Sequence, residues 1–274
     1  MKKGVFFFVL LVTFPLFSDA QISSPGLGKA AAASWFALGV RQELDTIKDK
    51  GWQSVTYAGL GRKSNPNDAN PFLKSAILVL NQEFYHQFHH NWEHSFALSY
   101  RKQDEYQDVA PYFHDSPKFE QEFRTYARLS YSYKHNRIKV VPTLRQEFRK
   151  FYAPDFSNMH ENFQLRTRLR LQFKAYLDTK KIHRIILGSE QLFAISNLHN
   201  PSRWTSYSYK ESRFTLYYAF SPQKTPFIIS AGYMYDLVGS KNVYDVHYLA
   251  FDVVLENIFK LRKRDKEAIN ENFE

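Results

Sequence analysis

The sequence contains no cysteine. Disulfide bonds, thiol catalysis and thiolate metal sites are therefore excluded, and the absence fits an exported protein that folds without oxidation. Apart from a stretch near the N-terminus, the chain also has no apolar run long enough for a helix that spans a bilayer. Any membrane crossing by the remainder would use strands, because only helices and closed barrels satisfy all their backbone groups in lipid.

The N-terminal stretch has the pattern of a secretory signal peptide. Lys2 and Lys3 precede the mostly apolar run Val5–Phe17, and the small residues Ser18 and Ala20 follow it. This run is too short to span about 30 Å of hydrocarbon as a helix. We expect residues 1–20 to be a signal peptide that is cleaved after Ala20.

Motifs of common enzyme classes are missing as well. The sequence has no G-x-S-x-G turn and no glycine-rich phosphate loop. His94 and Ser95 are adjacent, so on a strand they would face opposite sides and could not pair. Glu120 and Glu122 would share a face with arginines that hold both carboxylates ionised. We predict no catalytic residue, no cofactor and no metal, although triads assemble in space and a barrel enzyme stays a possible alternative.

Acidic residues are fewer than basic ones, with 27 Asp and Glu against 37 Lys and Arg, a formal net charge of +10. An exported chain rarely meets nucleic acid, so we do not expect it as a partner. Anionic lipid headgroups, lipopolysaccharide and anionic solutes are the expected partners of such a surplus, together with the outer-membrane assembly machinery.

The segment Phe163–Ala175 shows the alternation of apolar and polar residues that recurs along the chain. Apolar residues and threonine occupy every second position, and Gln164, Arg166, Arg168, Arg170, Gln172 and Lys174 lie between them. Alternate residues of a strand point to opposite faces, so one face would meet an apolar medium. Strands of soluble sheets usually have about five or six residues, whereas a strand that crosses a bilayer needs roughly 9–11. The length therefore favours a transmembrane strand.

A two-residue period recurs along the chain and predicts eleven strands. They are 34–44, 52–62, 72–86, 92–103, 119–134, 138–151, 163–175, 183–194, 211–220, 227–237 and 244–258. Aromatic residues are frequent, with 25 Phe, 18 Tyr and 4 Trp, as in barrels that have aromatic girdles at both membrane interfaces. The predicted fold is an all-β, antiparallel up-and-down transmembrane β-barrel over residues 21–259, followed by a charged tail over 260–274.

The connections also favour an outer-membrane barrel. Short turns are expected near 89–91, 135–136, 178–181 and 221–225, and longer polar loops at 63–71, 104–118, 152–162 and 195–210. Because single-chain bacterial barrels have even strand numbers, we expect about twelve strands, with ten as the alternative. Pro142 lies inside 138–151, where its missing N–H predicts a bulge or a shortened strand.

Several of these segments resemble a known family. They are Leu80–Tyr85, Leu144–Phe148, Leu165–Phe173, Gly188–Phe193, and the pair Ile229–Leu237 and Tyr244–Leu255. Together they are similar to an uncharacterised group of bacterial outer-membrane β-barrels, catalogued as domain of unknown function 2490. The resemblance covers roughly residues 34–258 and implies a barrel in the outer membrane, but it implies no activity. The charged tail departs from such barrels, which often finish on an aromatic residue.

If the apolar faces meet lipid, the charged faces line a lumen. The predicted lumen-lining residues are Arg124, Arg128, Arg145, Glu147, Arg149, Arg166, Arg168, Arg170, Glu190, Glu211, Arg213, Asp236 and Asp252. Residues 119–175 are mainly basic and 183–258 mainly acidic, which predicts two oppositely charged walls. A wide lumen of this kind would favour anions, whereas a narrow one would be plugged by an arginine–carboxylate network. We favour the plug.

His86, His89, His90 and His94 form the tightest histidine group. Neutral imidazoles can bind zinc or copper, but these four bracket a predicted turn and have no acidic or thiol companion. An exposed polar turn is the preferred interpretation.

Three functions follow from the sequence. The first is an integral outer-membrane barrel, either structural or a narrow channel for small and possibly anionic solutes. The second is a barrel enzyme that modifies lipid or lipopolysaccharide. The third is a soluble periplasmic carrier whose apolar faces point inward around a lipophilic ligand. The period alone does not decide which face is inside, although the strand length argues for lipid outside.

Overall fold

The computed structural model describes residues 26–44, 51–240 and 242–259. The expected signal peptide and its cleavage site, and the charged tail 260–274, lie outside these residues. Within them the chain forms one sheet of thirteen strands. Their bounds are β1 Ala32–Glu43, β2 Trp52–Lys63, β3 Lys74–His89, β4 Trp92–Tyr106, β5 His114–Tyr131, β6 Tyr133–His135, β7 Ile138–Tyr152, β8 Asn158–Tyr176, β9 His183–Leu198, β10 Arg203–Trp204, β11 Ser208–Phe220, β12 Phe227–Val238 and β13 Tyr244–Glu256.

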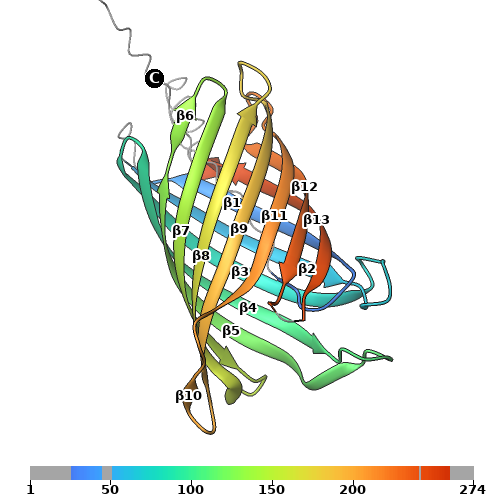
Figure 1. The fold of residues 1–274 in the computed structure, drawn as a ribbon. Helices are drawn as coiled ribbons and strands as arrows, with labels where there is room; N and C mark the ends of the chain where they lie inside the picture. The colour runs from blue at the N-terminus through green and yellow to red at the C-terminus, as the bar shows by residue number, and fades with distance from the viewer. Residues whose placement is uncertain (1–25, 45–50, 241, 260–274) are drawn as a thin grey trace, which may run out of the picture.

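The sheet closes into a barrel (Figure 1). Consecutive long strands pair antiparallel, and β6 and β10 only extend neighbouring hairpins, which leaves eleven strands in the described ring. The expected barrel of about twelve strands is therefore confirmed, and the eleven predicted segments correspond to the eleven ring strands. The twelfth strand, added because bacterial barrels are even-numbered, is not needed.

An odd ring closes because its first and last strands run parallel. β1 pairs with β13 from Ala32 opposite His247 to Arg41 opposite Glu256. In an antiparallel meander of eleven strands the first and last have the same direction, so only a parallel pair satisfies both edges. Arg41 Nη1 lies 2.7 Å from Glu256 Oε1 and fixes the end of this seam.

The two ends of the barrel differ. The connections 90–91, 136–137, 177–182 and 221–226 lie at one end, with the end of β13. The connections 64–73, 107–113, 153–157 and 199–207, with residues 239–240 and 242–243, lie at the other. We call these the short-turn end and the long-loop end. Several loops are shorter than predicted, because β5 begins at His114 and β8 at Asn158. The residues by which β5 and β8 start earlier are largely polar, so their sequence shows no alternation of apolar and polar residues that would predict a strand.

Pro142 does not shorten its strand. β7 runs unbroken from Ile138 to Tyr152, and Pro142 lies opposite Leu171 of β8. Pairing with the other neighbour is interrupted between Ser130–Thr143 and Tyr133–Val140, and the register is the same on both sides of this gap. The missing N–H of the proline therefore coincides with a local gap in one ladder and not with a bulge.

The interior has an apolar side and a charged side. Trp35, Ile77, Tyr217, Met234 and Tyr248 belong to a buried apolar cluster that also includes Leu27 of the segment before β1. The Leu27 backbone N–H donates to the Tyr248 hydroxyl at 3.0 Å, and the Leu27 carbonyl accepts from Lys63 Nζ at 2.9 Å. The segment before β1 thus lies against the inner wall at the long-loop end.

In the part of the chain that is described, no helix is both long and apolar enough to cross a membrane.

Candidate functional site: a charged lumen inside an apolar wall

The side-chain directions settle which face is inside. Leu98 on β4 is 65% exposed, whereas Arg124 on the neighbouring strand β5 is 1% exposed. The same contrast holds around the ring, so large apolar side chains cover the outer surface. They include Phe36, Leu38, Leu60, Leu80, Phe96, Leu129, Leu144, Leu169, Leu187, Leu216, Leu249 and Phe251. An apolar exterior of this extent is far larger than the patches that soluble monomers expose.

Aromatic side chains gather on this outer surface at both ends. At the short-turn end, Trp52 stacks on His86 at 4.5 Å between ring centres, and His183 stacks on Phe220 at 5.2 Å. At the long-loop end the pairs include Tyr100–Phe123, Phe163–Trp204 and Tyr235–His247. Two aromatic groups flanking an apolar band are typical of girdles at membrane–water interfaces.

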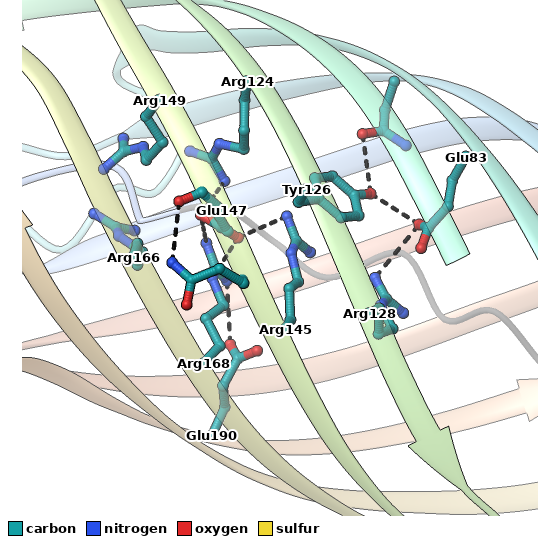
Figure 2. Close-up of polar contacts among 12 residues, drawn as sticks. Glu83, Arg124, Tyr126, Arg128, Arg145, Glu147, Arg149, Arg166, Arg168 and Glu190 are labelled. Carbon is teal, nitrogen blue, oxygen red and sulfur yellow. Dashed lines mark hydrogen bonds and ion pairs between the residues drawn. The ribbon is translucent and has the colours of Figure 1, made fainter. Parts of the chain in front are cut away.

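Most residues that the sequence places in a lumen meet in one network. Its hub is Glu147 on β7, which is 0% exposed. The Glu147 carboxylate lies 3.1 Å from Arg124 Nη1, 2.7 Å from Arg145 Nη2 and 2.7 Å from Arg168 Nε. Figure 2 shows these three guanidinium groups around the carboxylate. Three strands, β5, β7 and β8, therefore share one buried negative charge.

Glu122 on β5 forms the next node. Arg149 donates to it in a forked arrangement, with Nε at 2.9 Å from Oε1 and Nη2 at 2.8 Å from Oε2. Arg124 Nε donates to the same Oε1 atom, so Arg124 joins Glu122 to the Glu147 hub. Forked arginine–carboxylate pairs combine strength with a fixed geometry.

The network continues around the wall towards β12. Arg168 Nη1 lies 3.3 Å from Glu190 Oε2 on β9. Arg213 on β11 contacts Glu190 at 3.9 Å, pairs closely with Glu211, and lies 3.5 Å from Asp236 Oδ2 on β12. Charged contacts thus run without interruption from β5 to β12.

A smaller group surrounds Glu83 on β3. The Tyr126 hydroxyl donates to Glu83 Oε2 at 2.8 Å, Arg128 Nη2 lies 3.4 Å from the same atom, and Ser95 donates to Oε1. The Arg145 guanidinium lies 3.5 Å from the centre of the Tyr126 ring and so connects this group to the hub. Figure 2 shows both groups side by side.

Two more predicted residues lie on the inner face. Arg170 is on β8, beyond Arg168. Asp252 is on the inner face of β13 beside the apolar cluster, and it makes no ion pair with a described residue. The arrangement also differs from two opposed walls, because Glu122 and Glu147 lie within the basic segment and neutralise it locally.

Sequence reasoning missed the lumen roles of Glu83 and Arg101. Glu83 follows Val79 and Asn81 on the inner face of β3. Apolar residues therefore occur on both faces of this strand, and the sequence does not show which face points into the barrel. Arg101 lies near the end of the alternating segment 92–103, on the same face as Ser95 and Ser99. The polarity of this face was the signal that could have indicated its place in the lumen.

The histidine group divides between a turn and the outer surface. His89 and His90 flank the β3–β4 turn, whereas His86 and His94 face each other on β3 and β4, with ring centres 5.0 Å apart. Among the described residues, no set of three or more His, Asp or Glu side chains is arranged to hold a metal ion. Ser95 donates to Glu83 inside the barrel while His94 lies outside, so the two face opposite sides as predicted.

The network's chemistry is that of mutual neutralisation. Each of its carboxylates is held by at least one guanidinium, and Arg124, Glu147 and Arg213 are almost fully buried. Side chains that solvent cannot reach fill the interior at this level. Comparison with family profiles, with curated proteins and with solved structures found no match.

Proposed function

We propose that this protein is an integral outer-membrane β-barrel with a structural role, whose lumen is sealed by its own arginine–carboxylate network. The observation that carries the proposal is the division of faces, with apolar side chains outside and ion-paired side chains inside. Exposing the outer band to water would be unfavourable by about 25 cal/mol per Å² of apolar surface. Acyl chains of the bilayer remove that cost.

The resemblance to the barrels catalogued as domain of unknown function 2490 and the expected signal peptide support the same location. The sealed lumen is our inference from burial. Glu147 and Asp236 are each 0% exposed, which leaves no room for a wide water-filled channel beside them. The faces argue against a soluble carrier, because the interior is lined on one side by charges that a lipophilic ligand would leave unsolvated.

Membrane fractionation tests this function. Membranes from cells that express the full chain would be washed with high salt and then with alkaline carbonate. We expect the protein to stay in the outer-membrane pellet and to show heat-modifiable mobility on a gel. Release into the soluble fraction would contradict the proposal. Recordings from refolded protein in planar bilayers test the seal, for which we expect no stable open channel.

A further inference from the structure

The interior contains a cavity on the long-loop side of the network. Its volume is about 160 Å³. Its wall carries the guanidinium groups of Arg101, Arg149, Arg166 and Arg213 and the carboxyl groups of Glu120, Glu211 and Asp236, which come from β4, β5, β7, β8, β11 and β12. The cavity is therefore polar, and it lies between the ion-pair network and the loops.

Arg101 is the most informative of these residues. Its side chain lines the cavity and is 9% exposed, yet it makes no hydrogen bond or ion pair with any described residue. Glu122, which lies directly opposite it on β5, is already held by Arg124 and Arg149. A buried charge without a close partner is unfavourable, so an anion in the cavity would stabilise this guanidinium.

Two further guanidinium groups converge on the same cavity. Arg149 Nη1 and Arg166 Nε both donate to Gln164 Oε1, the second at 3.1 Å. Like charges are thus held close together by one neutral oxygen. Within the described part of the chain, the ion pair of Arg166 is a distant one, at 3.8 Å to Glu211. Among the described residues, neither Arg101 nor Arg166 is therefore held closely by a carboxylate of the cavity wall.

We propose that this cavity binds a small oxyanion, either a phosphate or a short carboxylate. Arg101 would supply a forked contact, because the guanidinium plane matches two oxygens of either group. Arg166 would supply a second contact from β8. Glu120, Glu211 and Asp236 also border the cavity, so their carboxyl groups disfavour a second negative charge on the ligand. A singly charged anion is the expected occupant.

This site goes beyond the proposed structural role and does not require the barrel to lie in a membrane. It can be tested on refolded protein in detergent, so soluble behaviour in the fractionation experiment would leave it standing.

Calorimetric titration tests the site. Inorganic phosphate at mildly acidic pH and acetate would be titrated separately, with ionic strength held constant by chloride. We expect saturable binding of at least one of them. Binding of phosphate alone or of acetate alone would identify which class the site takes. If neither binds saturably, the proposal is overturned.

Two variants localise the binding. Arg101→Gln is expected to weaken it at least tenfold, whereas Arg203→Gln, which removes an exposed charge at the same end, leaves it unchanged. If Arg101→Gln does not refold, Arg101→Lys takes its place in the test. This variant keeps the charge but loses the forked contact, so we expect it to bind the anion more weakly than the wild-type protein. Wild-type affinity in a folded Arg101 variant, judged by gel mobility, would overturn the assignment.

Discussion

Arg168 Nε lies 2.7 Å from Glu147 Oε1, and this pair joins β8 to β7 inside the barrel. Arg124 and Arg145 hold the same carboxylate. One buried anion thus pairs with three cations, two of which it shares with Glu122 and Glu190, and the network depends on it more than on any single arginine.

The first prediction follows from this hub. Glu147→Gln should lower the free energy of unfolding by about 3–5 kcal/mol, because it leaves buried guanidinium groups uncompensated. Urea unfolding of detergent-refolded protein, followed by tryptophan fluorescence, measures the change. Glu120→Gln is the matched control and should have a small effect, since Glu120 has no ion-pair partner among the described residues. Equal loss in both variants would contradict the hub.

Leu169→Arg tests the outer face. Leu169 is an exposed residue of β8 in the apolar band, and an arginine at the bilayer midplane on the lipid side costs about 2–4 kcal/mol. We expect this variant to assemble into membranes far less well than Leu169→Phe, and less well than Arg168→Leu. The heat-modifiable fraction in outer membranes gives the readout. Comparable assembly of Leu169→Arg and Leu169→Phe would argue against a lipid-facing band.

Gly232→Ala tests the packing of the apolar interior. A Cβ atom on Gly232 would overlap the Tyr217 ring, which lies directly across the β11–β12 pair. We expect the variant to lose about 1–3 kcal/mol, as is usual for overpacking. Ala231→Val, on the outer face of the same strand, should be nearly neutral. A folded Gly232→Ala protein of wild-type stability would show that the ring has another position.

The parallel seam can be tested by charge exchange. Arg41→Glu places two acidic side chains together at the end of β1 and β13, and Glu256→Arg places two basic ones there. Each single variant should be less stable than the double exchange, with a coupling of about 0.5–3 kcal/mol. Additive effects in the double-mutant cycle would mean that the two residues do not meet.

The order of the β8–β9 turn should depend on pH, through a carboxylate that lies outside the strands. The backbone N–H groups of His183 and Ile182 donate to the Asp178 carboxylate, at 2.7 and 3.1 Å, and hold its pKa below the ordinary value. The turn should therefore be fully ordered above the ordinary pKa of an aspartate and lose protection as pH falls through the lowered one. Amide exchange of His183 measures this. Asp178→Asn keeps one acceptor oxygen and cannot ionise, so its exchange protection should not change in that acidic range.

The sequence predicted the ring strands well because a lipid-type exterior imposes a strict two-residue period, as in Leu165, Leu169 and Phe173. It also placed the arginines of β5, β7 and β8 inside, because they share one face. The early starts of β5 and β8 could not be seen, since those residues extend past the apolar band. Because an even number of strands was expected, the parallel pairing of β1 with β13 was not predicted.

The pairing of individual charges could not be predicted either. Which carboxylate meets Arg124 depends on register between strands, and a shift of one residue turns every side chain to the other face. The open cavity beside Arg101 depends on this same register. Alternation along one strand identifies an inner residue, but it does not identify that residue's partner.

Because the chain has no cysteine, single thiols can report which face of a strand meets lipid. Leu98→Cys and Ser99→Cys, neighbours on β4 with opposite directions, would each be labelled with a small bimane and refolded into vesicles that contain brominated phospholipid. We predict strong quenching of the label at position 98 and little at position 99. Equal quenching at both positions, or stronger quenching at 99, would contradict an apolar exterior in lipid around a charged lumen.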